Sequence, residues 1–389
     1  MDVFKNPFFE NQTYFTQDET SVLSSIHFNK ALVVSTKGSG ERGFLNHFKK
    51  MGSRCDFFLE IQQFPLLSPL VDFAKKCIDQ NKTYDQVIAV GGGSVLDSAK
   101  VLALLLKSDR VVLDQVNTNA ILDGLKNQSA AVNLISIPTT PGTGSEVTPY
   151  ATLWDLENKK KLSVQHSLIV PQVSILSTAY FKTLPFENIL YSMLDSLTQC
   201  FESLWNKNYT PKIYDYAAKG IIELILTLNQ ISILAHDDER KKCLLEGRAG
   251  SIIRSGFLSG LAISQTKTAL CHSMSYPLTA HYKVPHGLAC GVFLPAVLDF
   301  NSSTDLDPLL LRASGFESVA KLKSHLIDLY KKLDLLNRLR QYGVTEEKIM
   351  NISSEMLTPG RSDNNFRFVD VGLTRDIIHQ TFANLETGI

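Results

Sequence analysis

The stretch DQVIAVGGGSVLDSAK, residues 85–100, predicts the fold of the first half of the chain. Residues 85–90 are typical of a buried strand, and three glycines follow at 91–93. Glycine lacks a Cβ atom, so the backbone can turn sharply there and approach a ligand closely. A helix that begins near Ser94 would point its unpaired N–H groups at that place, where a pyrophosphate commonly binds. The stretch is not the GxGxxG fingerprint, and a plain strand-turn-helix corner is the alternative.

The preceding residues show the same alternation of strand and helix. Residues 31–36 form a short β-branched run that ends in a glycine turn, and a helix is expected from there to about Met51. Residues 56–60 are predicted to form a second strand. Apolar residues then recur at helical spacing over residues 65–80. This alternation indicates a parallel sheet covered by helices.

A second polar turn follows the next buried strand. Residues 131–137 are predicted as that strand, and PTTPGTGSEVT at 138–148 supplies hydroxyl groups on small side chains. Such a turn can hydrogen-bond a polar ligand without filling its space. In open parallel sheets, ligands bind beyond the carboxyl ends of the strands. The two turns together therefore predict a nucleotide-binding α/β domain.

A β-hairpin is expected next, with strands at 150–154 and 159–164 joined by a polar turn at 155–158. Its lysine cluster is typical of a solvated face, although Lys161 can instead point inward toward a cofactor. The residues that we assign to cofactor binding are Thr36, Gly91, Gly92, Gly93, Ser94, Asp97, Thr139, Thr140, Thr143, Ser145 and Lys161.

The character of the chain changes near residue 183. Beyond this point strand signals fade, and helical patterns continue to the C-terminus. We therefore expect an α/β dinucleotide-binding domain at 1–182 and an α-helical metal- and substrate-binding domain at 183–389. No Gly/Ser linker separates them, which predicts two domains that pack tightly around a shared cleft.

Composition argues against several classes of partner. Lys+Arg and Asp+Glu are equal at 39 each, so no global field favours nucleic acid or an anionic membrane. The longest apolar run is too short to span a bilayer, and the N-terminal residues lack a secretory signal pattern. The six cysteines show no CxxC spacing, which indicates reduced thiols in a cytoplasmic protein.

Four polar side chains in the second half are candidates for one divalent metal site. Asp195 and Gln199 lie one turn apart in an otherwise apolar helix predicted at about 185–203. A buried carboxylate needs a partner, which is a metal, an arginine or a backbone cap. His272 and His286 lie where a helix end and a following turn can bring two imidazoles together. This donor set suits Fe²⁺, Zn²⁺, Co²⁺, Ni²⁺ or Mn²⁺.

Two neighbours of these histidines have alternative roles. Cys271 directly precedes His272, but a packed core thiol is favoured over a metal ligand. His281 is balanced between a packing role and a proton relay.

The order of these motifs resembles that of the iron-containing (group III) alcohol dehydrogenases. The shared segments are GGGSVLDSAK at 91–100, PTTPGTGSE at 138–146, Asp195, and the region from His272 to PHG at 285–287. The resemblance spans nearly the whole chain. It implies a Rossmann-like N-terminal domain and a helical C-terminal domain, the two-domain plan shared with dehydroquinate synthase. It also implies an NAD(P)H cofactor and one metal in the interdomain cleft.

The same resemblance implies a metal held by one aspartate and three histidines. Asp195, His272 and His286 match three of these ligands, whereas Gln199 stands where the family usually has histidine. An amide oxygen is a weaker donor than imidazole, so looser binding of Fe²⁺ or Zn²⁺ and greater tolerance of Mn²⁺ or Mg²⁺ are expected. Tyr276 replaces another histidine that often lines the site, and Tyr276 or His281 is expected to relay the proton.

The resemblance also indicates a substrate class. Gln199 and SYPLT at 275–279 are similar to a subset that resembles the phosphonoacetaldehyde reductases. Lys267, one turn before His272, suits an anionic substrate if it faces the cleft and is otherwise a solvent-facing helix residue. The implied reaction is reduction of a short aldehyde, in which the metal polarises the aldehyde oxygen and hydride comes from the dihydronicotinamide. The reverse reaction would be alcohol oxidation.

The cofactor preference can be argued from the end of the first strand. Dehydrogenases that prefer NAD commonly place an acid there to bind the ribose 2′-hydroxyl group. Residues 35–39, STKGS, contain no acid and include a lysine. This leaves room for a 2′-phosphate, which favours dual use or NADP(H).

Two other functions remain compatible with the sequence. A lyase of the dehydroquinate-synthase type would use NAD transiently. Such a lyase is expected to have more basic residues in its cleft and, typically, another histidine among its metal ligands. A non-catalytic nucleotide-binding relative is the second alternative, because Gln199 weakens the metal set. A homodimer is implied by the resemblance alone.

Overall fold

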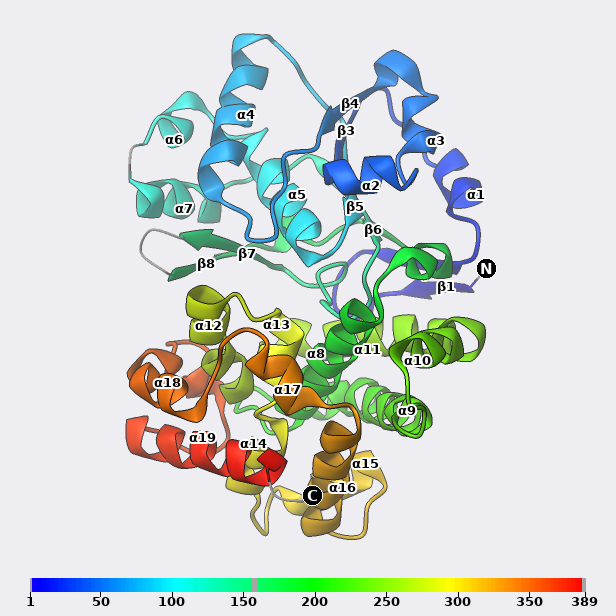
Figure 1. Ribbon diagram of the computed structural model, residues 1–389. Helices are drawn as coiled ribbons and strands as arrows, with labels where there is room; N and C mark the ends of the chain where they lie inside the picture. The colour runs from blue at the N-terminus through cyan, green and yellow to red at the C-terminus, as the bar shows by residue number, and fades with distance from the viewer. Residues whose placement is uncertain (1, 116, 156–159, 387–389) are drawn as a thin grey trace. The chain divides into compact units, whose positions relative to one another are not determined.

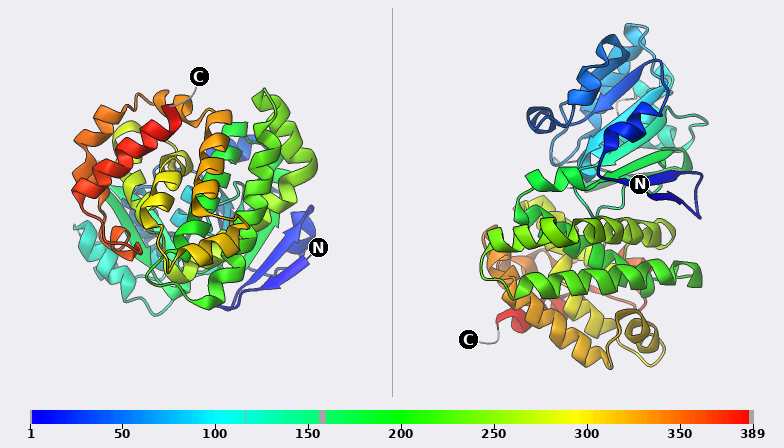
Figure 2. Two further views of the ribbon diagram at one scale, coloured as in Figure 1. Left: turned by 90° about the horizontal axis from the view of Figure 1, so that it is seen from below. Right: turned by 90° about the vertical axis from the view of Figure 1, so that its right-hand side faces the viewer.

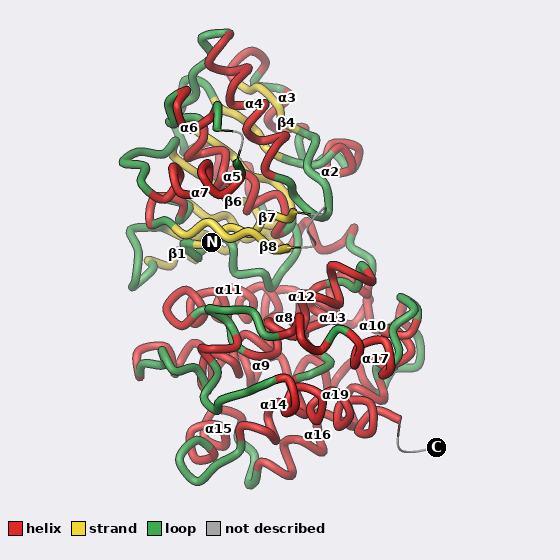
Figure 3. The backbone as a smooth tube through the Cα atoms, turned by 90° about the vertical axis from the view of Figure 1, so that its left-hand side faces the viewer, coloured by secondary structure: helices red, strands yellow, loops and turns green. Residues whose placement is uncertain are grey.

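The structure is a computed structural model that describes residues 2–115, 117–155 and 160–386 (Figure 1). The chain divides into two compact units, Met1–Leu184 and Pro185–Ile389, which we call the N-terminal and C-terminal units. All named strands belong to the N-terminal unit, and the C-terminal unit is built from helices and loops (Figure 3). The predicted fold class, an α/β unit followed by an all-α unit, is confirmed. No described helix is long and apolar enough to cross a membrane.

The N-terminal unit contains a seven-stranded sheet in the order β1-β2-β9-β6-β5-β3-β4. Among its described strands, only the β1–β2 pair is antiparallel. The strand bounds are β1 (Asp2–Lys5), β2 (Gln12–Thr16), β3 (Ala31–Val34), β4 (Cys55–Phe58), β5 (Gln86–Gly91), β6 (Asn133–Pro138) and β9 (Val173–Ser177). The chain moves from β3 outward to β4 and then returns to β5 on the other side of β3. This reversal places a topological switch point between β3 and β5. The first predicted ligand turn begins at the end of β5, and the second begins at the end of the neighbouring strand β6.

The central strands are buried on both faces. Leu32 and Val34 of β3 belong to one apolar cluster, whereas Ala31 and Val33 belong to the other. Side chains of a strand alternate between the two faces, so a strand covered on both sides shows a continuous apolar run. This is the physical reason that the sequence pattern identified these strands.

Helices cover both faces of this sheet (Figure 1). Their bounds are α1 (Glu19–Ser24), α2 (Lys37–Glu41), α3 (Asn46–Lys49), α4 (Leu67–Asp79), α5 (Gly93–Leu105), α6 (Arg110–Leu113) and α7 (Thr118–Lys126). The continuous helix expected up to Met51 is wrong. The chain forms the separate helices α2 and α3 because Gly43 between them adopts φ +82°, which no α-helix accommodates.

The predicted hairpin is present as β7 (Tyr150–Asp155) and β8 (Lys160–Gln165), paired antiparallel with Trp154 opposite Lys161. Most of its expected turn, and Lys159, lie outside the described residues. The main-chain N–H of Trp154 donates to the carbonyl of Pro65, so the hairpin is attached to the loop before α4.

The C-terminal unit is organised around α8 (Phe186–Leu204), which is buried along nearly its whole length. Helices α8, α9 and α11 lie side by side (Figure 2). The remaining bounds are α9 (Tyr214–Ser232), α10 (Asp237–Cys243), α11 (Ala249–Thr266), α12 (Leu270–Tyr282), α13 (His286–Gly291), α14 (Leu294–Asn301), α15 (Asp307–Ser314), α16 (Val319–Lys332), α17 (Leu335–Arg340), α18 (Glu346–Asn351) and α19 (Val371–Glu386). A helix buried all round accepts polar residues only where they find partners, and α8 carries several.

Candidate functional site

Four potential metal ligands converge in the C-terminal unit. One ligand atom each from Asp195, His272, His286 and Cys290 lies within 4.8 Å of the others, and we call this group the Asp195 cluster. The residues come from α8, α12 and α13, and all are buried except the half-buried His286. Carboxylate, imidazole and thiolate donors fit a borderline divalent ion such as Fe²⁺ or Zn²⁺.

A glycine brings α13 against α8 at this cluster. A Cβ atom on Gly287 would lie 1.9 Å from the carbonyl oxygen of Tyr191 and 3.2 Å from the Cβ of Asp195. No side chain fits in that space. Gly287 follows His286 directly, so the close contact that its missing side chain allows also brings His286 near Asp195.

His272 lies between two buried carboxylates. Its Nε2 is 3.1 Å from Asp195 Oδ1, and its Nδ1 is 2.7 Å from Glu202 Oε2. Glu202 also accepts hydrogen bonds from the main-chain N–H groups of His272 and Ala269, at 3.1 and 2.8 Å. The Glu202 carboxylate therefore fixes the orientation of the His272 ring through Nδ1, and Nε2 faces the cluster. Carboxylate partners commonly orient metal-binding histidines in this way.

The electrostatics follow from this geometry. Burial lowers the pKa of His272, but the Glu202 and Asp195 carboxylates outweigh it and raise the pKa to about 10. Burial raises the pKa of Asp195, but the hydrogen bond from His272 and the charge of His286 bring it below its usual range. The cluster therefore keeps a carboxylate charged inside the protein, as a metal site requires.

Gln199 contributes to the cluster through its nitrogen. Its Nε2 donates to Asp195 Oδ1 at 3.0 Å, and its Oε1 accepts from the Ser259 hydroxyl at 2.9 Å. An amide nitrogen is not a metal donor, so in this arrangement Gln199 orients Asp195. A metal-ligating Gln199 would need the opposite amide orientation, and that role stays a prediction.

The sequence interpretation missed Glu202 and Cys290. Asp195, Gln199 and Glu202 are spaced at i, i+4 and i+7, so they share one face of α8, a spacing that would have identified the third residue. Cys290 is four residues after His286, and its Sγ is 3.7 Å from Asp195 Oδ1. Cys271, by contrast, lies outside the Asp195 cluster as a fully buried thiol.

The three residues predicted for catalysis have different surroundings. The Tyr276 ring stacks on that of His286, with centroids 6.2 Å apart. His281 pairs with Glu355 at 2.7 Å, and nine residues of helix put it on the side of α12 opposite His272. Lys267 is half-buried at the C-terminal end of α11. The structure therefore brings Tyr276, and not His281, to the Asp195 cluster.

The two predicted ligand turns of the N-terminal unit touch each other. Strands β5 and β6 are neighbours, with Gly91 opposite Pro138. A Cβ atom on Gly92 would lie 3.0 Å from the Thr140 hydroxyl, and one on Gly93 would lie 2.9 Å from Cγ2 of Thr143. Thr139 also donates its main-chain N–H to the Gly91 carbonyl. Two loops far apart in sequence thus form one glycine- and hydroxyl-rich surface at the N-terminus of α5.

Asp97 and Ser145 face each other within this region. Ser145 Oγ donates to Asp97 Oδ1 at 2.6 Å, and the N–H of Thr152 donates to Asp97 Oδ2 at 2.8 Å. Burial raises the pKa of Asp97, against the opposing charges of Lys100 and, to a smaller extent, Lys161. These bonds tie α5 to the second turn and to β7, so Asp97 and Ser145 hold the two turns in place.

Lys100 completes this arrangement. Its fully buried Nζ donates to the carbonyls of Thr148 and Tyr150 at 2.8 and 2.7 Å and to the Thr148 hydroxyl at 3.2 Å. Burial lowers its pKa to about 8, against the opposing charges of Asp97 and Glu146. We call Asp97, Lys100, Ser145 and Glu146 the Lys100 cluster.

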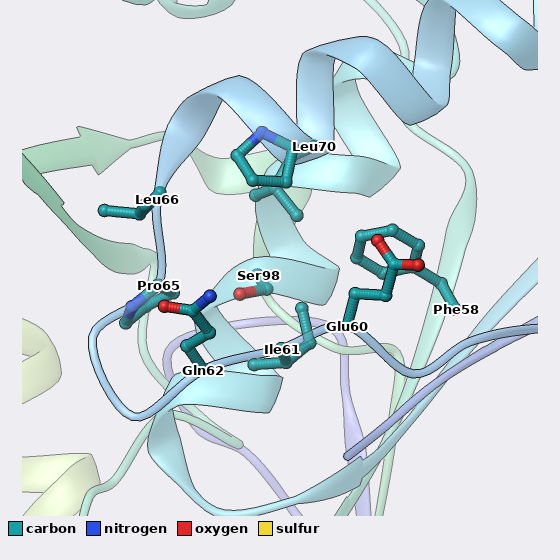
Figure 4. A pocket seen from close by; sticks show the side chains of 9 residues that line it. Phe58, Glu60, Ile61, Gln62, Pro65, Leu66, Leu70 and Ser98 are labelled. Atoms are coloured by element: carbon teal, nitrogen blue, oxygen red, sulfur yellow. The ribbon is translucent and has the colours of Figure 1, made fainter. Parts of the chain in front are cut away.

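The remaining predicted cofactor residues lie around the same strand ends. Thr36 caps α2 by accepting from the N–H of Ser39, and its backbone bridges that of Glu60. Ser94 Oγ donates to the carbonyl of Gln63. Residues 60–62, 65 and 66 of the loop that follows β4 and Ser98 of α5 help to line a small pocket (Figure 4). Glu60 is an acid at a strand end that the sequence argument for NADP(H) did not weigh.

Two family models match the chain. The model described as iron-containing alcohol dehydrogenase matches residues 12–178. The model described as Fe-containing alcohol dehydrogenase family, C-terminal, matches residues 189–382. Both are alcohol dehydrogenase models, which favours an oxidoreductase over the lyase that the sequence left open.

Relatives and solved structures agree with these matches. The chain is 33% identical to a phosphonoacetaldehyde reductase of Streptomyces viridochromogenes over 218 residues, 56% of this chain and 53% of that protein. It is 25% identical to an NADPH-dependent butanol dehydrogenase of Clostridium saccharobutylicum over 351 residues, 87% of each chain. The fold is similar to an iron-containing alcohol dehydrogenase from Thermococcus thioreducens, with TM-score 0.80 and 21% identity over 96% of this chain and 99% of that one. A sulfoacetaldehyde reductase from Bifidobacterium kashiwanohense in complex with NAD⁺ matches with TM-score 0.76 and 21% identity over 97% of each chain.

Proposed function

This chain belongs to the iron-containing alcohol dehydrogenase family, and from that premise we propose that it is a metal-dependent, NAD(P)H-linked reductase of a short aldehyde. The observation that carries the proposal is the convergence of Asp195, His272 and His286 within the Asp195 cluster. These three residues are the ligands that the family resemblance implied. We assign the metal to this cluster, with Cys290 as an additional donor.

The proposed roles follow from the contacts of each side chain. A bound divalent metal supplies Lewis-acid polarisation of the aldehyde oxygen, and a bound dihydronicotinamide supplies the hydride. Asp195 contributes the negative charge of the site, and His272 presents Nε2 because Glu202 holds its Nδ1 at 2.7 Å. Gln199 keeps Asp195 oriented through its 3.0 Å hydrogen bond.

Tyr276 is the proposed proton donor to the product alkoxide. Its ring stacks on the ring of His286 at an interplanar angle of 15°, which places a phenol directly beside a metal ligand. His281 is engaged by Glu355 and is a weaker candidate. Tyr276→Phe should lower kcat about 10²-fold or more while leaving bound metal unchanged, since general acid catalysis typically contributes that factor.

The cofactor is assigned to the paired turns of the N-terminal unit. Gly91 to Gly93 permit close approach of a pyrophosphate to the N-terminus of α5, and Thr139, Thr140 and Thr143 supply hydroxyl groups beside it. The lack of an acid in residues 35–39 supports use of NADP(H). Glu60, which follows strand β4 and bridges Thr36, supports use of NAD(H). We propose dual use, and Glu60→Gln should shift the ratio of kcat/KM toward NADPH.

Phosphonoacetaldehyde is the proposed substrate. One relative, 33% identical over 218 residues, is a phosphonoacetaldehyde reductase, and Gln199 and Tyr276 follow the pattern that suggested this subset. An anionic aldehyde needs a cationic side chain near its carbonyl site, and Lys267 is the candidate that the sequence singled out.

One assay tests the reductase proposal. Purified protein is mixed with NADPH or NADH, with Fe²⁺, Zn²⁺ or Mn²⁺, and with short aldehydes that include phosphonoacetaldehyde and propanal. Loss of absorbance at the reduced-nicotinamide band is expected. No loss with any combination of metal and aldehyde would reject the proposal.

A second measurement tests the metal site independently. His286→Ala should lower both the metal content, measured by elemental analysis, and the activity. Unchanged metal content would remove His286 from the ligand set. His281→Ala is the matched control, because this histidine of α12 pairs with Glu355 and should leave metal content unchanged.

A further inference from the structure

Lys267 has a backbone conformation that lysine rarely adopts. It follows α11 with φ 64° and ψ −179°, a region of the Ramachandran map that is populated almost only by glycine. Such strain persists only where the surrounding structure enforces it, and it concentrates at functional sites. The side chain is half-buried rather than extended into solvent. A glycine would satisfy this backbone without strain, so the lysine side chain itself must contribute something that glycine lacks.

The surrounding chain holds this segment by its carbonyl groups. Side-chain amides of three asparagines donate to three successive carbonyls: Asn208 to Thr266 at 3.3 Å, Asn206 to Lys267 at 3.2 Å, and Asn364 to Thr268 at 3.0 Å. The Thr266 hydroxyl adds a second hydrogen bond to the Lys267 carbonyl at 2.8 Å. These contacts fix the backbone that carries the lysine.

A second cation lies beside Lys267. Arg361 comes from the loop that also supplies Asn364, whose N–H donates to the Arg361 carbonyl at 3.0 Å. Asn364 also donates its side-chain amide to the Thr268 carbonyl at 3.0 Å, so the loop that carries Arg361 packs against the segment that carries Lys267. The pKa of Lys267 is lowered, first by burial and then by the positive charge of Arg361. Like charges are held together at an energetic cost unless an anion binds between them.

The guanidinium of Arg361 is left incompletely paired. Its Nη1 donates to the Gly360 carbonyl at 2.8 Å, whereas its Nε is buried and has no hydrogen-bond partner. Among the residues that the structure describes, no carboxylate forms an ion pair with it. The neighbouring Asp363 directs Oδ2 to the N–H of Gly360 at 3.0 Å instead. A buried, unpartnered donor on a cation is the complement of an oxyanion.

Glu202 connects this pair to the metal ligands. Its Oε2 accepts both from the N–H of Ala269, two residues after Lys267, at 2.8 Å and from His272 Nδ1 at 2.7 Å. The segment that carries Lys267 is therefore fastened to the same carboxylate that orients a ligand. In a two-carbon aldehyde, the head group is two bonds from the carbonyl carbon, so its binding site must adjoin the metal site.

We propose that Lys267 and Arg361 together bind the tetrahedral oxyanion, phosphonate or sulfonate, of a short aldehyde whose carbonyl group is reduced at the Asp195 cluster. This inference rests on the proposed function for its chemistry. Lys267 supplies a point charge, and Arg361 supplies directed N–H donors. The pair determines specificity and takes no part in hydride or proton transfer.

Kinetic discrimination is the first arm of the test. The ratio of kcat/KM for phosphonoacetaldehyde to that for propanal is measured for the metal-loaded wild type, Lys267→Gly and Arg361→Gln. Loss of one charge-assisted interaction should lower this ratio about 10- to 100-fold in each variant. Sulfoacetaldehyde, run in parallel, shows whether the site prefers a phosphonate or a sulfonate. Lys267→Gly suits the backbone, so its Tm should be at or above that of the wild type.

Lys283→Gly is the matched control. Lys283 also follows a helix of the same unit with positive φ, at 60°, and its Nζ donates to the carbonyl of Ala280. Relief of strain is thus common to both glycine variants. Only Lys267→Gly should lose the preference for the anionic aldehyde, and an equal loss in Lys283→Gly would reject the assignment to Lys267.

The second arm measures binding without turnover. Methylphosphonate should raise the Tm of the wild type and of Lys283→Gly, but not that of Lys267→Gly or Arg361→Gln. A wild type that reduces propanal with no preference for anionic aldehydes and no response to methylphosphonate would overturn this inference and leave the proposed function standing. A wild type that reduces no aldehyde yet responds to methylphosphonate through both residues would overturn the proposed function alone.

Discussion

The Lys100 cluster and the Asp195 cluster both bury charged side chains, but they satisfy them differently. The three donors of Lys100 Nζ reach three acceptors of the chain, and both oxygens of Asp97 accept a hydrogen bond. In the Asp195 cluster, the two imidazoles and the thiol converge on the Asp195 carboxylate. A cluster whose groups are satisfied by the chain stabilises the fold, whereas one whose ligand atoms converge on one another is suited to hold an ion.

This difference changes the interpretation of the motif at 91–100. Asp97 was predicted to contact the cofactor, yet its hydrogen bonds go to Ser145 and Thr152. We now propose that Asp97, Lys100 and Ser145 position the two turns, and that the glycines and threonines of those turns contact the cofactor. We call the Lys100 cluster closed, because groups of the chain satisfy its charges, and the Asp195 cluster open, because its ligand atoms converge on one another. Substitutions in the two clusters should therefore act differently, and the expected effects decrease from Lys100 to Gln199.

Lys100→Met should have the largest effect, because it leaves Asp97 and Glu146 without their buried cation. Leaving buried charges without compensation in this way reduces the free energy of unfolding by about 3–5 kcal/mol, which urea denaturation would measure. Adding Glu146→Gln to Lys100→Met should recover part of the loss. The exposed Lys107→Met is the control and should stay within about 0.5 kcal/mol of wild type. A loss below about 1 kcal/mol in Lys100→Met would contradict the closed-cluster assignment.

Gly287→Ala should damage the open cluster through sterics. The added Cβ meets the Tyr191 carbonyl at 1.9 Å, so α13 must move and carry His286 away from Asp195. Overpacking of this kind costs about 1–3 kcal/mol, and metal content should fall with it. In Gly250→Ala, the new Cβ meets nothing within 4 Å, so this variant should be unchanged or slightly stabilised. Full metal content in Gly287→Ala would show that the contact of the two helices does not set the site.

Glu202→Gln should weaken metal binding. The amide keeps the shape of the side chain but removes the charge that holds His272 Nδ1, and loss of such a partner typically lowers metal affinity about 10- to 100-fold. Competition with a chelator followed by elemental analysis measures this change. Glu355→Gln removes the carboxylate of the His281 pair instead and should leave metal affinity as in the wild type. Equal effects of the two substitutions would refute a specific role for Glu202.

Gln199→His should give the smallest change and in the opposite direction. The substitution adds an imidazole one turn from Asp195, where the family usually has a histidine. We expect metal affinity to rise about tenfold, or 1.4 kcal/mol. Gln199→Met, which keeps the bulk without a donor, should lower affinity slightly because Asp195 loses a hydrogen bond. A fall in affinity with histidine would mean that orienting Asp195 matters more than a fourth ligand.

Local patterns in the sequence were sufficient to predict much of this protein. The buried strands before Gly91 and Pro138 were recognisable because strands covered on both faces are continuously apolar. Asp195, His272 and His286 were recognisable because a carboxylate in an apolar helix needs a partner, and histidines near a helix end can share a metal with it. These inferences needed only spacing and burial, which the order of residues encodes directly.

Tertiary structure alone decided which partner each polar group found. Gln199 turned its nitrogen to Asp195 because Ser259 of α11 takes its oxygen, and Asp97 turned to Ser145, 48 residues away. The loop that carries Arg361 came to lie beside Lys267 because Asn364 of that loop donates to the Thr268 carbonyl, 96 residues away. Hydrogen-bond partners and charge pairs depend on distances of a few ångströms between remote segments, and those distances are set when the helices and strands pack.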